Sequence, residues 1–170
     1  MTSNEHVFYS TDAIAKVGDD LAKAINDKAG EKLVNADKVH ATIDEITKAK
    51  EELGHYHIAQ THPLADYIIQ NSEVHDITPD GFRLATLNEQ EPSASDVNDM
   101  LKLIESGDLD MLVDSPQTTD AVSGRLVEAA KAKGLPIVEV WETPAKGESF
   151  FDLYLKTIES LKATGDAATA

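Results

Sequence analysis

From residue 55 onward, short β-rich runs alternate with helical stretches, and this alternation constrains the fold more than any other feature of the chain. Each run is followed by a loop and then by a helical segment of about 10 to 15 residues, which is typical of βαβ units. The four runs that we predict to be strands are 56–60, 83–87, 111–114 and 137–141. The pattern therefore predicts an α/β fold with a four-stranded parallel sheet flanked by helices.

Two helices are predicted ahead of this sheet. Apolar residues recur every three or four positions from Ile14 to Ile25, behind Ser10 or Thr11 as a cap, and Gly30 ends the run. A second helix carries a narrow apolar seam within 32–53, until Gly54 stops it. We therefore divide the chain into an N-terminal helical segment, an α/β lobe and a frayed tail, with the boundaries 1–54, 55–163 and 164–170.

The helices of the predicted lobe carry local start signals. Ser93 with Asp96 forms a capping box, and Ser149 with Asp152 is placed to do the same at the last helix. Gly134 is followed by Leu135 and a proline, which ends the helix before the last strand.

Composition narrows the possible functions. Asp and Glu number 31 against 15 Lys and Arg, a formal net charge of −16 that repels nucleic acid, so we expect no nucleic-acid partner. The chain has no cysteine, so a metal must be held by His, Asp or Glu. We also expect no signal peptide, no lipid-anchor cysteine and no membrane-spanning helix in this chain.

The residues that follow the predicted strands suggest where a ligand could bind. In open parallel sheets, ligand sites lie beyond the carboxyl ends of the strands. His62 follows the first predicted strand, and carboxylates follow the others in the segments 88–92, 114–117 and 141–144. Imidazole with carboxylate suits zinc or manganese, although polar residues cap helices at this rim in every α/β domain. Both interpretations stay open at this point.

Other chemistry has weaker support in the sequence. The phosphate-binding loops, the nucleophile elbow and the zinc-protease helix motif are all missing, so we do not expect an enzyme. His55 and His57 alternate on one face of the first strand, as two metal ligands could, but positions at the start of a strand are the simpler interpretation. We expect His40 and His75 to be solvated.

Three segments together resemble the zinc- and manganese-binding receptors of ABC importers. Segment 4–10, NEHVFYS, is similar to the family's NxHvWyd element, and segment 61–67, THPLADY, is similar to its sHpaFgYla element. Segments 137–142 and 147–151 resemble the family's last strand and the start of its final helix. The resemblance implies that His6, His62 and Glu142 are metal ligands, with zinc favoured over manganese.

The same resemblance implies that the chain is the C-terminal lobe of such a receptor, with helix 32–53 as the helix that connects the lobes. The implied partners are a metal ion, the membrane permease of an ABC importer, and the missing N-terminal lobe or a second copy of the chain. The implied location is the extracellular face of the membrane or the periplasm. Because one family ligand lies on the missing lobe, we expect an open, exchangeable site. The alternatives are an inert scaffold or interaction domain with an incomplete metal site, and a small flavodoxin-like regulatory or enzymatic domain.

Overall fold

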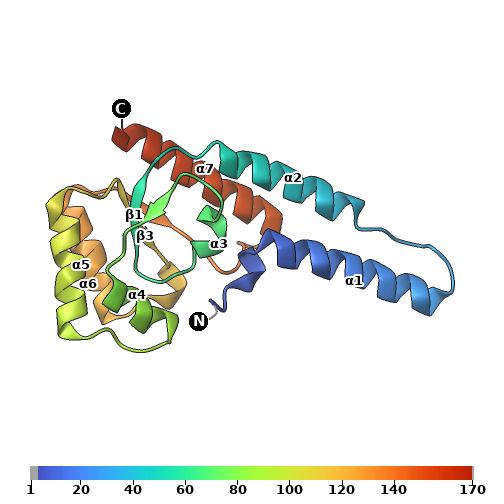
Figure 1. Cartoon of the computed structure of the whole chain (residues 1–170), viewed down its shortest axis with the longest axis horizontal. Coiled ribbons are helices and arrows are strands. Elements are labelled where there is room, and N and C mark those ends of the chain that lie inside the picture. The colour runs from blue at the N-terminus through green and yellow to red at the C-terminus, as the bar shows by residue number, and fades with distance from the viewer. Residues whose placement is uncertain (1–3, 170) are drawn as a thin grey trace.

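The computed structural model describes residues 4–169, which form an α/β lobe with a two-helix arm projecting from it (Figure 1). The arm and the elements leading to it are η1 (Val7–Tyr9), α1 (Thr11–Ala29) and α2 (Asp37–Glu51). The lobe contains β1 (His57–Gln60), α3 (Asp66–Ile69), β2 (His75–Asp76), α4 (Asp80–Leu87), α5 (Ala94–Ser106), β3 (Met111–Asp114), η2 (Pro116–Thr118), α6 (Ala121–Lys133), β4 (Ile137–Glu139) and α7 (Phe150–Thr169).

The sheet has the strand order β2-β1-β3-β4, and every pairing is parallel. This confirms the predicted α/β fold class with a four-stranded parallel sheet. The first and last strands are shorter than expected, because β1 begins at His57 and β4 ends at Glu139.

The predicted second strand is wrong. Residues 83–87 belong to α4, and the strand at that position in the fold is the two-residue β2, in which His75 pairs with His57. Pro79 stands directly before α4 with Asp80 in its first turn, and both favour a helix start. Leu84 is 57% exposed, whereas a strand inside the sheet would bury it.

Helices cover both faces of the sheet (Figure 1). On one face α5 and α6 pack with Ala59 and Leu112 of the strands. On the other face α7 and α2 pack with Ile58, Met111 and Val113. Because successive strand residues point to opposite faces, one short strand such as β3 contributes to both cores. The sheet is therefore held between two layers of helices.

The helix ends follow the sequence signals. Ser10 Oγ accepts a hydrogen bond from the amide of Ala13 at the start of α1, and Gly30 ends the helix with φ 75°. Capping boxes form at Ser93 with Asp96 and at Ser149 with Asp152.

The last helix is longer than expected. Helix α7 continues to Thr169 instead of giving way to a frayed tail at Thr164, whereas Ala170 and residues 1–3 lie outside the described residues. The reason is tertiary: Gly165 is buried against the ring of Tyr56, where a β-carbon would meet the ring at 2.5 Å. Only glycine permits this contact, which holds the last turns of α7 on the lobe.

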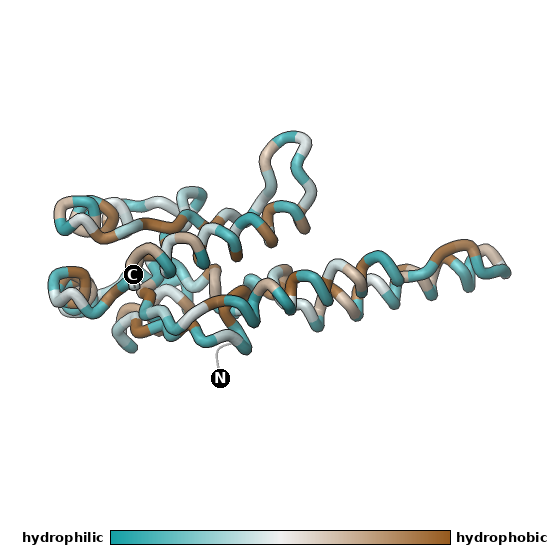
Figure 2. Tube along the Cα trace, turned by 90° about the horizontal axis from the view of Figure 1, so that it is seen from above, coloured by the Kyte–Doolittle hydropathy of each residue, from teal (hydrophilic) through white to brown (hydrophobic). Residues whose placement is uncertain are grey.

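The outer part of the arm is largely exposed, whereas Ile46 and Lys50 anchor the end of α2 in the lobe. Figure 2 shows apolar residues recurring along it, and Val17, Leu21 and Ile25 of α1 are 46 to 58% exposed. The side chain of Asn26 bonds the backbone of Leu33 and Val34 and so closes the loop between α1 and α2. Within residues 4–169, no helix combines the length and apolar character needed to cross a membrane.

Candidate metal centre

The loop that carries His62 is tied down at the carboxyl end of β1. The Gln60 Oε1 accepts a hydrogen bond from the amide of Ala65 at 2.9 Å, which closes the loop behind His62. The Thr61 hydroxyl donates to Asp114 Oδ1 at 2.7 Å, and so joins this loop to the end of β3. His62 is therefore placed on the rim where ligand sites of parallel sheets lie.

His6 reaches the same rim from the N-terminal segment and is only 4% exposed. Its ring is oriented by Asn4, whose Nδ2 donates to Pro63 O at 2.6 Å and to Asp66 Oδ2 at 2.8 Å. The Asn4 Oδ1 must then accept, and it lies 2.9 Å from the backbone nitrogen of His6 and 2.7 Å from its Nδ1. Nδ1 of His6 therefore carries the proton, and Nε2 keeps a free lone pair.

Asp66, which holds Asn4, is itself held by Arg83 of α4. The guanidinium donates to both oxygens of Asp66, at 2.7 and 3.1 Å, and also to Asp76 Oδ2. Gln60 Nε2 donates to the same two carboxylates at 2.9 Å. A continuous polar network thus runs from α4 through Asp66 to the ring of His6, and the fork of arginine suits such a bidentate contact.

The structure brings the three ligand candidates of the sequence together. The rings of His6 and His62 are 4.9 Å apart between centroids, and His6 Nε2 lies 3.8 Å from Glu142 Oε1. The backbone amide of Glu142 donates to Gln117 Oε1 at 2.7 Å, which links the segment after β4 to η2. Glu142 is half-buried and reaches the cluster through His6.

Glu5 joins the cluster as well, and sequence reasoning missed it. One ligand atom from each of Glu5, His6 and His62 lies within 4.8 Å of the other two. The one feature of the sequence that could have pointed to Glu5 is its position next to His6. The loop conformation that brings Glu5 close to His62 cannot be predicted from neighbouring residues. The rim therefore offers two imidazoles and two carboxylates.

Burial controls the protonation of the two histidines. Burial lowers the pKa of His6, and the carboxylates of Glu142 and Asp66 oppose this shift in part. Burial also lowers the pKa of His62, with the neighbouring His6 adding to the effect. Both imidazoles are therefore neutral near pH 7, the form in which histidine binds a metal.

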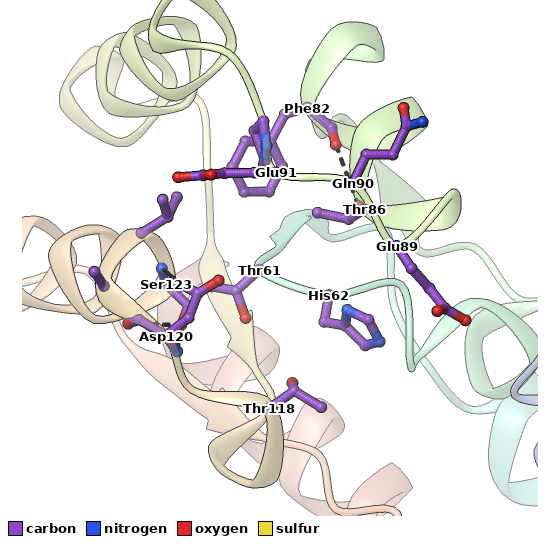
Figure 3. A pocket seen from close by; sticks show the side chains of 13 residues that line it. Thr61, His62, Phe82, Thr86, Glu89, Gln90, Glu91, Thr118, Asp120 and Ser123 are labelled. Atoms are coloured by element: carbon purple, nitrogen blue, oxygen red, sulfur yellow. Dashed lines mark hydrogen bonds between the residues drawn. The ribbon is translucent and has the colours of Figure 1, made fainter.

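A cavity of about 480 Å³ opens beside His62 (Figure 3). Its lining includes the carboxylates of Glu89, Glu91 and Asp120. The segment 88–92 thus lies at the rim as expected, although it follows helix α4 and not a strand. Carboxylates thus line the cavity next to His62.

Fold and site together define an α/β lobe that carries an imidazole–carboxylate cluster at the carboxyl edge of its sheet. Residues 2–164 match the model of the family described as zinc-uptake complex component A, periplasmic (ZnuA), so the chain belongs to this family. A comparison with curated proteins gave no significant match.

Solved structures share the fold. The periplasmic zinc-binding protein TroA of Treponema pallidum superposes with a TM-score of 0.66 at 14% identity, over 95% of this chain and 63% of TroA. A mutant of the laminin-binding adhesin Lmb of Streptococcus agalactiae gives 0.65 at 12% identity, over 95% and 62%. The protein FpvC of Pseudomonas aeruginosa, solved with Mn²⁺, gives 0.59 at 15% identity, over 98% and 62%. The chain thus spans less than two thirds of the length of these proteins.

Proposed function

We propose that this lobe binds a divalent transition metal, as part of the solute-binding receptor of an ABC importer. The ligands are His6, His62 and Glu142, with Glu5 as a fourth donor. The observation that carries the proposal is the pair of imidazoles beside two carboxylates, with His6 Nε2 left free by the hydrogen bond between Nδ1 and Asn4. Family membership supports the same class of function.

The donor set favours zinc over manganese. Two imidazole nitrogens with two carboxylate oxygens suit tetrahedral zinc, whereas manganese prefers a shell richer in oxygen. Donor atoms around tetrahedral zinc lie about 3.3 Å apart. The 3.8 Å between His6 Nε2 and Glu142 Oε1 must therefore shorten by about 0.5 Å, and the separations among Glu5, His6 and His62, which are at most 4.8 Å, by up to about 1.5 Å. Glu5 is exposed and Glu142 half-buried, so these side chains move onto the ion while His6 stays in place.

The same proposal covers partners and location. TroA is described as periplasmic, and this chain spans about 63% of its length. We therefore propose that the open side of the site is covered by an N-terminal lobe or by a second copy of the chain, and that the assembly delivers metal to a membrane permease outside the cytoplasm. The sequence led us to expect a site that lacks its fourth ligand. With Glu5 as that ligand, the chain itself can offer four donor atoms to the metal.

A second candidate function is an interaction domain. The exposed apolar residues Val17, Leu21 and Ile25 on α1 favour it, because a stripe of this kind on a projecting helix is suited to a partner surface. An interaction domain with an incomplete metal site would hold no metal after purification, so the metal content of the purified protein separates the two functions.

Calorimetric titration with Zn²⁺ and Mn²⁺ tests the proposal. His62→Ala is expected to weaken zinc binding by at least 10-fold, because it removes one of about four bonds. His40→Ala is the matched control, since His40 is an exposed imidazole paired with Asp19 on the arm. Equal zinc binding by wild type and His62→Ala would overturn the assignment, and tighter binding of Mn²⁺ than of Zn²⁺ would overturn the choice of metal.

A further inference from the structure

A second group of imidazoles lies at the opposite, amino-terminal end of the sheet. His57 is the first residue of β1 and His75 the first of β2, and the parallel register places them directly beside each other. His55 lies in a bend just before β1, and its ring is close to those of both His57 and His75. Three of the six histidines of the protein therefore gather at one corner of the fold.

The ring centres of the three histidines are separated by distances close to those in a metal site, although their nitrogens do not converge as they stand: within residues 4–169, only Glu5, His6 and His62 have ligand atoms mutually within 4.8 Å. Their centroids are 4.4 Å apart for His55 and His75, 5.3 Å for His55 and His57, and 5.9 Å for His57 and His75. A zinc–nitrogen bond of about 2.0–2.1 Å places the centre of a bound ring roughly 3.2 Å from the ion, so tetrahedral rings have centroids about 5 Å apart. All three observed separations lie within about 1 Å of this value.

The imidazole nitrogens are available to a ligand. His55 and His75 are exposed and His57 is half-buried. Among residues 4–169, none of these three rings takes part in a hydrogen bond, in contrast to His6 and His40. The three rings must turn about their side-chain bonds to direct one nitrogen each at a common point, and their exposure permits this.

The backbone under the cluster is fixed. The amide of His57 donates to Asp110 Oδ2 at 2.7 Å, and the amide of Asp110 donates back to the carbonyl of His57 at 2.9 Å. The amide of His75 donates to the carbonyl of Tyr56 at 2.7 Å. Two of the three histidines thus stand on paired strands, so a metal there meets a scaffold that is already ordered.

We propose that His55, His57 and His75 form a second metal site, specific for divalent ions that prefer imidazole, with Zn²⁺ as the reference ion. Three imidazoles leave the fourth position to water, so this site is open and exchanges its metal readily. The length of β1, about 10 Å, lies between this group and the loop that carries His62, so the two sites cannot share one ion. The net charge of −16 raises the local concentration of cations at both sites.

The test is a Zn²⁺ titration of the full chain without a histidine tag. Calorimetry measures the binding, and ¹⁵N NMR monitors the imidazole signals of each histidine. We expect two zinc ions per chain, with the signals of His55, His57 and His75 shifting together as the weaker site fills. The double variant His55→Ala/His75→Ala changes only exposed side chains and is expected to remove that one ion. His40→Ala is the matched control and is expected to keep both ions.

The two proposed sites are separable in this experiment. His62→Ala is expected to weaken the tighter event by at least 10-fold and to leave the shifts of His55, His57 and His75 unchanged, so failure of one site does not imply failure of the other. Zinc stoichiometry that is unaltered in His55→Ala/His75→Ala, or signals of the three histidines that do not move with zinc, would overturn the second site.

Discussion

The amide oxygen of Asn4 lies 2.7 Å from Nδ1 of His6 and fixes both the tautomer and the direction of that ring. Loss of such a supporting hydrogen bond typically costs 10- to 100-fold in metal affinity. We therefore expect Asn4→Ala to weaken zinc binding by roughly 10-fold. Calorimetry measures this, with Asn35→Ala as the control because Asn35 bonds only within the exposed turn before α2. Equal affinities for the two variants would show that Asn4 does not orient the ring.

Arg83 is expected to stabilise the fold through the two carboxylates that it joins. Arg83→Met leaves Asp66 and Asp76 facing each other without their cation. Loss of one partner of a fully buried pair costs about 3–5 kcal/mol, and we expect roughly 1–3 kcal/mol here because the Arg83 side chain is 31% exposed. Urea unfolding measures the change, and Arg125→Met is the exposed control. A variant as stable as this control would contradict the role of the network.

The two carboxylates are expected to contribute separately to zinc affinity. Glu142→Gln and Glu5→Gln each replace an anionic ligand by a neutral amide of the same shape, so each should weaken zinc binding by several-fold or more. Glu73→Gln removes the same charge at an exposed position outside the cluster and controls for net charge. If all three variants bind zinc alike, the carboxylates act only through the general field of the protein.

The buried side chain of Lys50 is expected to make the stability of the fold depend on pH. Burial lowers the pKa of Lys50 to about 8, and its ammonium donates to the carbonyl of Tyr67 at 2.9 Å. Between pH 8 and 10.5 the unfolded chain binds this proton and the folded chain does not, so the free energy of unfolding rises with pH, by at most about 1.4 kcal/mol per unit. The stability of wild type should therefore rise relative to Lys50→Met across this window.

Lys48→Met is the control for that measurement, because Lys48 lies on the exposed side of the same helix. The difference between wild type and Lys48→Met should stay flat from pH 8 to 10.5. A flat difference for Lys50→Met as well would mean that Lys50 titrates like a solvated lysine.

Sequence patterns predicted the parts of the fold that local chemistry determines. The capping boxes at Ser93 and Ser149 and the ends of α1 are set by side chains within a few residues, and these predictions are confirmed. Strand β2 was not predicted, because two residues are too few to show an alternating pattern. Its pairing also depends on His57, which lies 18 positions earlier than His75. The full length of α7 was not predicted, because it depends on the contact of Gly165 with Tyr56, which is distant in the chain.

In the candidate site, too, some residues could be predicted from the sequence and others could not. His6, His62 and Glu142 were found because they stand in recognisable segments, and the structure brings them together. The residues that position them, above all Arg83, were missed because their contacts join segments that are distant in the chain. The burial of His6 was also not predictable, since the residue is 4% exposed through contacts with segments distant in the chain.

The most direct test of the metal site is a Zn²⁺ titration read through the ring nitrogens of His6 and His62 by ¹⁵N NMR. Our account predicts that the first equivalent of zinc shifts Nε2 of His6 to the position of a metal-bound nitrogen, while Nδ1 keeps its proton. One ring nitrogen of His62 should shift to the same degree at the same zinc ratio. If both histidines keep their signals while zinc binds elsewhere on the chain, the proposed metal centre is wrong.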